Sequence, residues 1–326
     1  MTVASPGRPT SATTARSTRF VADRRPEAEA LGTRLGDLVA EPDVLAAELS
    51  DGFARLADPE YIDGQRRVAP GIGSLFGVRW PLVEAVKRGF RGATRRDPPA
   101  SLLLVAARLF EGTELELRWF AFGLLERLVA DDPERTWQLL RRAGQEAADW
   151  ITVDSLAHPV AKGIAGEPYR WAELEQLVYS PNRWERRLVG STIATLTHVD
   201  RRRGREKTVA EHGLALVGDL IGDAEPDVQK ALSWALRSLV AVDRPAVVEF
   251  CEREVATAAD NDDGARAWVI RDSLSKLPPH DAARLRTDLA GIRRRPGVAS
   301  TSRAALTADQ FRGIGLGREL PRPPLT

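Results

Sequence analysis

The chain contains 326 residues, and its 47 lysines and arginines almost balance 46 aspartates and glutamates, for a formal net charge of +1. Hydrophobic residues make up 43% and charged residues 29%, so a large core can form, and a uniformly polycationic protein is excluded but a locally basic groove is not. One cysteine, Cys251, excludes a disulfide framework and cysteine-based zinc or iron–sulfur sites. With four scattered histidines and no apolar run of ~18 residues, we expect a soluble, cytoplasmic protein that uses no metal or other cofactor.

The two ends of the chain lack an apolar period. Residues 1–25 are rich in Ser, Thr, Pro and Arg without the apolar core of a secretory signal, and residues 294–326 have a similar composition. We therefore expect a disordered N-terminal tail over 1–25, a helical repeat domain over 26–293 and a flexible C-terminal tail over 294–326.

Between these ends, helical patterns follow one another. An apolar stripe over 114–129 holds four side chains, with four polar ones mostly off it: Leu117, Phe120, Leu124 and Leu128 on the stripe, and Glu116, Arg118, Glu126 and Arg127 off it. Upstream, a glycine-rich approach to a helix expected from Pro81 lacks the spacing of known phosphate-binding loops, so it is weak evidence for such a loop.

Cap and proline signals open the helices that follow. Asp132-Pro133 begins one, Ser180-Pro181-Asn182 precedes a helix over 184–196, and Glu225-Pro226 precedes one over 228–240. Further helices are expected at 244–258, 264–276 and 281–293, and no alternating pattern indicates a strand. We therefore predict an all-α fold, a curved solenoid of HEAT-like repeats of about 40–47 residues whose concave face is a binding surface.

Three segments place a tryptophan near charged side chains. Trp150 and Asp154 share one helical face, Trp184 neighbours Arg186 and Arg187, and Trp234 lies on an amphipathic helix. Each alone is most simply a core tryptophan beside solvated charges. However, Arg187 follows Trp150 by 37 residues and precedes Trp234 by 47, close to the repeat length, so these side chains can line one concave wall.

Five segments, taken in order, resemble the alkylpurine DNA glycosylases of the HEAT-like-repeat DNA alkylation repair family. They are LFGVRWP (75–81), LELRWFAFGLLERL (115–128), DWITVDSLA (149–157), SPNRWERRLVGS (180–191) and DVQKALSWALRSL (227–239). The resemblance covers about residues 40–290 and matches the family's functional tryptophans, aspartate and arginine to Trp150, Trp234, Asp154 and Arg187.

The resemblance implies a monofunctional glycosylase that removes cationic N3- or N7-alkylated purines from double-stranded DNA without base flipping. Asp154 is then expected to stabilise the sugar cation and position water, Trp150 and Trp234 to flank the lesion, and Arg187 to hold a phosphate. The implied enzyme is a monomer that acts on DNA and not on membranes. Further phosphate contacts are expected from basic and aromatic side chains of the same face: Arg183, Trp184, Arg186, Lys230, Arg237 and the run 201–207.

Two other functions fit a helical repeat protein. A non-catalytic module that binds branched or damaged DNA by shape would gain nothing from a carboxylate such as Asp154 on its DNA face. A protein–protein scaffold would show a large exposed apolar patch in place of tryptophans and arginines.

Overall fold

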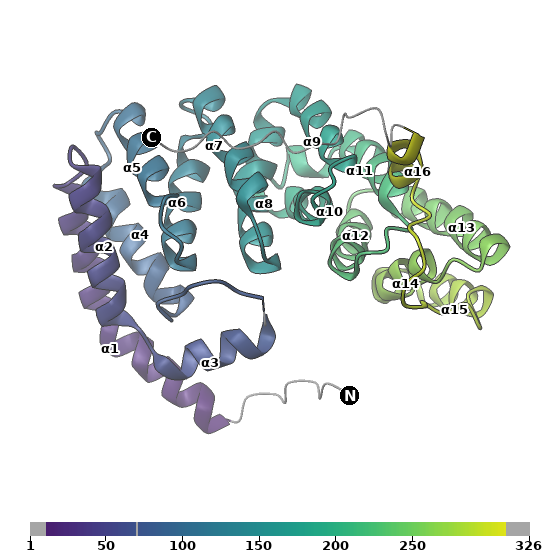
Figure 1. The fold of residues 1–326 in the computed structure, drawn as a ribbon, viewed down its shortest axis with the longest axis horizontal. Coiled ribbons are helices and arrows are strands. Elements are labelled where there is room, and N and C mark those ends of the chain that lie inside the picture. Colours follow the sequence, from purple (N-terminus) through teal and green to yellow (C-terminus); the bar gives the residue numbers. More distant parts are fainter. Residues whose placement is uncertain (1–10, 70, 311–326) are drawn as a thin grey trace. The chain divides into compact units, whose positions relative to one another are not determined.

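The structure, a computed structural model, describes residues 11–69 and 71–310 (Figure 1). This described part forms sixteen α-helices and three short 3₁₀ turns and contains no strand, which confirms the all-α fold. None of its helices is long and apolar enough to cross a bilayer. The chain divides into two compact units, Met1–Gly163 (unit 1) and Ile164–Thr326 (unit 2). The repeat domain predicted over 26–293 includes residues of both units and stays a prediction.

Unit 1 contains two rows of packed helices. One row holds α1, α4 and α6, the other α2, α5 and α7, and the rows meet where α5 and α7 pack against α6. The helices are α1 (Ser11–Gly36), α2 (Pro42–Leu56), α3 (Pro59–Val68), α4 (Trp80–Ala93), α5 (Pro99–Leu109), α6 (Leu115–Leu128), α7 (Pro133–Glu146) and α8 (Trp150–Gly166). The boundary between the units falls in the last turn of α8.

Unit 2 is also built from two rows. Helix α12 packs between α10 and α14, and α13 packs against α11 and α15 in the second row. The helices are α9 (Trp171–Val178), α10 (Arg183–Val199), α11 (Lys207–Leu220), α12 (Pro226–Leu239), α13 (Arg244–Asn261), α14 (Gly264–Ser273), α15 (Pro279–Asp288) and α16 (Arg303–Gln310). Such paired rows are the packing expected of helical repeats, while the curvature of a solenoid stays a prediction.

Local sequence sets where these helices begin. The Asp132 carboxylate accepts the Arg135 N–H at the start of α7, and the Asn182 side chain accepts the Trp184 N–H at 2.9 Å at the start of α10. Pro226 occupies the first turn of α12, where its missing N–H costs nothing. The starts of α7, α10 and α12 therefore follow the predicted signals closely.

A glycine sets how closely α10 and α12 approach. A Cβ atom added to Gly190 would lie 2.8 Å from the Ala231 carbonyl carbon and 2.9 Å from its Cβ. Neither helix could keep this spacing with a larger side chain at 190. Gly190 thus holds Arg187, one turn earlier on α10, close to the start of α12.

The predicted disorder over 1–25 is wrong for residues 11–25, which form the first turns of α1. The Arg16 guanidinium donates to the buried Asp58 carboxylate at 3.2 Å, and Asp58 also caps α3 through the Glu60 N–H. Further along, Leu31 and Leu35 of α1 are buried where α1 packs on α4. Contacts made by residues distant in sequence fold this polar segment, and residues 1–10 lie outside the described part.

The predicted flexible tail over 294–326 is likewise wrong for residues 294–310. The Thr301 N–H donates to the Gly222 carbonyl at 3.0 Å, its hydroxyl donates to Asp263, and α16 packs against α11 (Figure 1). The segment is polar because it forms hydrogen bonds across unit 2. Residues 311–326 lie outside the described part.

Candidate functional site

The first pair of predicted site residues lies on α8 in unit 1. Trp150 is the first residue of this helix, Asp154 follows one turn later, and both side chains are partly exposed. The buried carboxylate of the preceding residue, Asp149, accepts the Thr152 N–H at 2.9 Å and its hydroxyl at 2.6 Å. Asp149 therefore caps α8, a role that the sequence interpretation missed although an Asp-x-x-Thr spacing signals it.

The second pair lies in unit 2. Arg187 of α10 is only 5% exposed and donates to the backbone carbonyl of Asp227 at 2.6 Å, in the first turn of α12. Trp234 lies about two turns further along α12 and is partly exposed. The packing of α10 on α12 thus brings Arg187 and Trp234 to neighbouring helices. The two pairs belong to different units, and each is described by itself.

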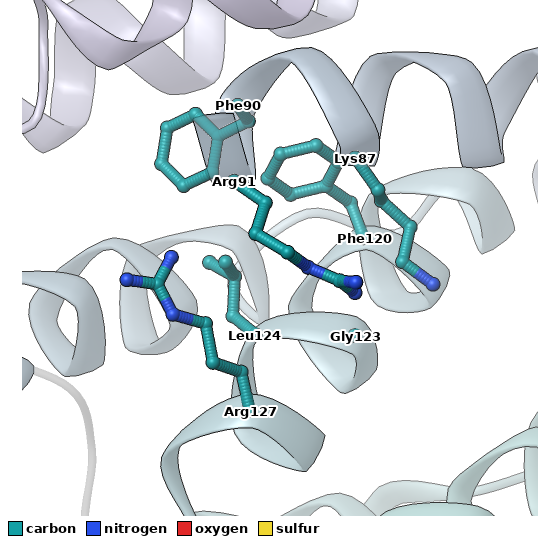
Figure 2. A pocket seen from close by; sticks show the side chains of 7 residues that line it. All are labelled: Lys87, Phe90, Arg91, Phe120, Gly123, Leu124 and Arg127. Carbon is teal, nitrogen blue, oxygen red and sulfur yellow. The ribbon is translucent and has the colours of Figure 1, made fainter. Parts of the chain in front are cut away.

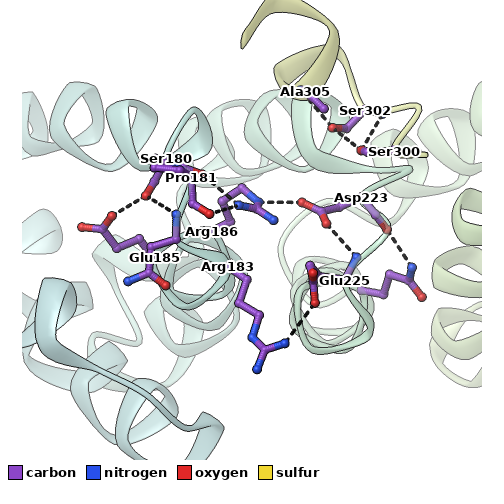
Figure 3. A network of polar contacts seen from close by, with 12 residues as sticks. Ser180, Pro181, Arg183, Glu185, Arg186, Asp223, Glu225, Ser300, Ser302 and Ala305 are labelled. Carbon is purple, nitrogen blue, oxygen red and sulfur yellow. Dashed lines mark hydrogen bonds and ion pairs between the residues drawn. The ribbon is translucent and has the colours of Figure 1, made fainter. Parts of the chain in front are cut away.

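Arg186, predicted to bind DNA, is held by protein groups (Figure 3). Its guanidinium donates to Asp223 at 2.7 Å and to the carbonyls of Ser180 at 2.8 Å and Pro181 at 3.1 Å. The Asp223 side chain is 5% exposed, so this is a largely buried ion pair that links the turn before α10 to the turn before α12. The Arg186 guanidinium is therefore paired with protein groups in this structure, and its predicted contact with DNA stays a prediction.

Arg237 has the same character, because its guanidinium donates to the carboxylate and carbonyl of Asp272 and so ties α12 to α14. Arg183 is more accessible: it lies 4.8 Å over the Trp184 ring and forms an exposed ion pair with Glu225 at 3.3 Å. Exposed ion pairs of this kind are weak, so the arginine can exchange its carboxylate partner for a phosphate. Of these predicted DNA-binding residues, Arg183 and Trp184 keep a geometry suited to that role.

Lys230 and the run 201–207 are accessible too. The Lys230 side chain is 60% exposed, and its ammonium lies 3.6 Å from Asp227. In the loop before α11, the Asp200 carboxylate accepts the N–H groups of Arg202 and Arg203, both at 2.9 Å. These hydrogen bonds, the Arg203 N–H first, lower the pKa of Asp200. Asp200 therefore fixes the loop, whose arginines are exposed, and the Arg203 guanidinium also donates to the Ala165 carbonyl at 3.0 Å.

Glu116 on α6, one of the polar residues placed off the apolar stripe, is buried. It is 1% exposed, and its carboxylate accepts the N–H groups of Phe76, Gly77 and Val78 at 2.8–3.0 Å. Burial raises the pKa of this carboxyl, and the N–H groups offset this only in part. The N–H groups of the glycine-rich loop before α4 thus bind a carboxylate of the chain itself.

Comparison with known proteins identifies one family. Residues 49–277, more than half of the chain, match the family model described as DNA alkylation repair enzyme. This range includes α8, α10 and α12 with all four predicted site residues. No curated protein matches the chain.

Proposed function

The chain belongs to the DNA alkylation repair enzyme family, and from this premise we propose that it is a monofunctional DNA glycosylase. Its substrates are cationic N3- or N7-alkylated purines in duplex DNA, and its products are the free base and an abasic site. The observation that carries this proposal is the pair on α8: Asp154 lies one turn from the indole of Trp150, while the neighbouring Asp149 caps the helix.

The reaction needs a carboxylate more than an acid. An N-alkylated purine is a cation and leaves as a neutral base once the bond from C1′ breaks, so no proton donor is required. Water then adds to C1′ and releases a proton, and the sugar passes through an oxocarbenium-like cation. The Asp154 carboxylate would stabilise that cation and orient the water. One charge pair at ~4 Å with an effective dielectric of ~20 contributes about 4 kcal/mol, roughly a thousandfold in rate.

The aromatic and basic side chains have binding roles in this proposal. The indole faces of Trp150 and Trp234 attract cations by ~0.5–2 kcal/mol and suit a charged lesion or the sugar beside it. In this proposal Arg187, which also donates to the Asp227 carbonyl, is the phosphate ligand near the lesion. Arg187→Ala is expected to weaken DNA binding and to lower its salt slope by about 0.9, the value of one phosphate contact.

Because these groups act from outside the stacked base, the proposed enzyme does not flip the lesion into a pocket. Its chemistry requires neither metal nor cofactor and assigns no lysine as an imine-forming nucleophile, so it breaks no DNA strand. It acts as a monomer on double-stranded DNA.

The direct test is incubation of the full chain with duplex DNA that contains 7-methylguanine. The proposal predicts free 7-methylguanine, strands that break only after alkali, and unchanged release in EDTA. Asp154→Asn should bind this DNA and release no base, whereas Asp63→Asn, an exposed carboxylate of α3, serves as the matched control and should behave as the wild type. DNA binding without release by the wild-type protein would favour the shape-reading module instead.

A further inference from the structure

A cleft lies between α4 and α6 in unit 1, and none of the predicted site residues lines it (Figure 2). It is shallow, with a volume of about 10 Å³, and opens to solvent. Its lining combines three cations with apolar side chains and one glycine: Lys87, Arg91, Arg127, Phe90, Phe120, Leu124 and Gly123. In Figure 2 the side chain of Arg91 lies between those of Lys87 and Arg127.

The positive charge of this cleft is only partly neutralised. Lys87 forms an ion pair with Glu84. Arg127 donates to the hydroxyl of Thr94 at 2.9 Å and to its carbonyl at 2.7 Å, and both of these partners are uncharged. Arg91 is exposed, and no described residue forms an ion pair or hydrogen bond with its guanidinium. The guanidiniums of Arg91 and Arg127 therefore lack a carboxylate partner, and that of Arg91 is available to bind an anion.

The apolar floor of the cleft increases the attraction between these cations and an anion. The floor consists of almost fully buried apolar side chains, those of Phe90, Phe120 and Leu124. The cations therefore lie beside a region of low dielectric constant, which screens their charge less than water does. Gly123 adds a specific cradle: a Cβ atom at this position would lie 2.1 Å from Cε of Lys87 and 2.6 Å from its Nζ. The lysine chain crosses α6 only because this residue has no side chain.

An aromatic residue extends this surface. Trp80 begins α4, is 43% exposed, and lies with its ring 5.1 Å from the Lys87 ammonium. An exposed indole beside a row of cations is the combination with which proteins follow a nucleic-acid backbone. Guanidiniums in turn fit the forked oxygens of a phosphate.

We propose that the α4–α6 cleft binds a phosphodiester of the DNA backbone, with Arg91 as its direct ligand and Lys87 and Arg127 as flanking charges. That the bound phosphate belongs to DNA rests on the proposed function. That the cleft binds an anion follows from its own cations. The site positions the duplex on unit 1 and takes no part in bond cleavage.

The experiment measures binding of the full chain to an undamaged duplex at several salt concentrations. Arg91→Ala should weaken binding about tenfold near 0.1 M salt and lower the slope of log K against log salt by about 0.9. Arg91→Lys should retain the slope. Arg142→Ala removes an equal charge from an exposed ion pair within α7 and is the matched control, with unchanged slope. Equal slopes for Arg91→Ala and the wild type would overturn the proposal.

Gly123→Ala tests the cradle without removing a charge. Its Cβ would displace only the flexible end of Lys87, so the fold should persist and DNA affinity should fall by a factor of about three. Inorganic tripolyphosphate should compete with DNA less well against Arg91→Ala than against the wild type, and equal competition would contradict an anion site. Because the DNA is undamaged, a failure of base excision leaves these outcomes intact, and failure here leaves the glycosylase proposal intact.

Discussion

The α4–α6 cleft of unit 1 and the α10–α12–α14 row of unit 2 use arginine in opposite ways. In the row, Arg186 and Arg237 are bound to Asp223 and Asp272, which lie on neighbouring elements. In the cleft, the Arg91 guanidinium has no such partner among the described residues. The number of arginines on a surface therefore says little about anion binding, and the presence of a carboxylate beside each one decides it.

Buried carboxylates show the same contrast. Asp223 neutralises a guanidinium, whereas Glu116 of α6 accepts three backbone N–H groups of the loop before α4. Glu116 thus shapes a loop of unit 1 and pairs with no cation, and Arg91 and Arg127 of the α4–α6 cleft have no carboxylate partner among the described residues. Four predictions can break or sharpen this comparison, beginning with the largest effect.

Loss of Arg186 should affect stability and not DNA binding. Arg186→Ala leaves the buried Asp223 carboxylate unpaired, so the free energy of unfolding in urea should fall by about 3 kcal/mol. Arg183→Ala, which removes an exposed pair, should cost less than about 1 kcal/mol. Unchanged stability of Arg186→Ala together with a lower salt slope would place Arg186 among the DNA ligands.

Substitution of the two glycines at helix contacts, Gly190 and Gly123, should lower the stability of unit 2 more than that of unit 1. Gly190→Ala forces a methyl group against the Ala231 backbone and should lower the free energy of unfolding by about 2 kcal/mol. Gly123→Ala meets only a lysine side chain, so its stability should stay within about 1 kcal/mol of the wild type. Equal losses in thermal and urea unfolding would show that the Lys87 cradle is as rigid as the α10–α12 contact.

The role of Glu116 should appear in pH dependence. Glu116→Gln turns an amide donor toward one of the three N–H groups and should cost about 1–2 kcal/mol at pH 7. Since burial raises the folded pKa of Glu116, its contribution is full below the unfolded pKa and declines as the pH rises through the folded value. The stability difference between wild type and variant should therefore be larger at pH 4.5 than at pH 7.5. A difference that shrinks on acidification would contradict a raised pKa.

The smallest effect concerns Cys251, which reports on the opening of unit 2. Burial raises the pKa of this thiol to about 12, so the native protein should react very slowly with a thiol reagent at pH 8. Arg186→Ala should accelerate the labelling through local opening, whereas Gly123→Ala in unit 1 should not. Fast labelling of the wild-type protein would contradict the burial.

The sequence predicted the positions of the helices well and the contacts of the polar side chains poorly. Proline and cap residues act within four positions, so the starts of α7, α10 and α12 could be read directly. The partners of Arg16, Arg186 and Glu116 lie about forty positions away, and no local pattern encodes them. The helical start at Ser11 and the packed segment 294–310 were missed for this reason.

The candidate site was predicted through family resemblance more than through spacing. The pattern placed Trp150 and Asp154 on one helical face, and the structure has them one turn apart on α8. Arg91 and Lys87 also lie one turn apart, but a period of charges on α4 cannot reveal that Gly123 of α6 accommodates the lysine. Only packing identifies this cleft.

The most direct test of the central claim, that Asp154 carries the chemistry, is the single-turnover rate of 7-methylguanine release with enzyme in saturating excess over duplex DNA. The account predicts that Asp154→Asn releases the base about a thousandfold more slowly than the wild type while its DNA affinity is retained. Asp63→Asn should match the wild-type rate. Equal rates for Asp154→Asn and the wild type would contradict the account.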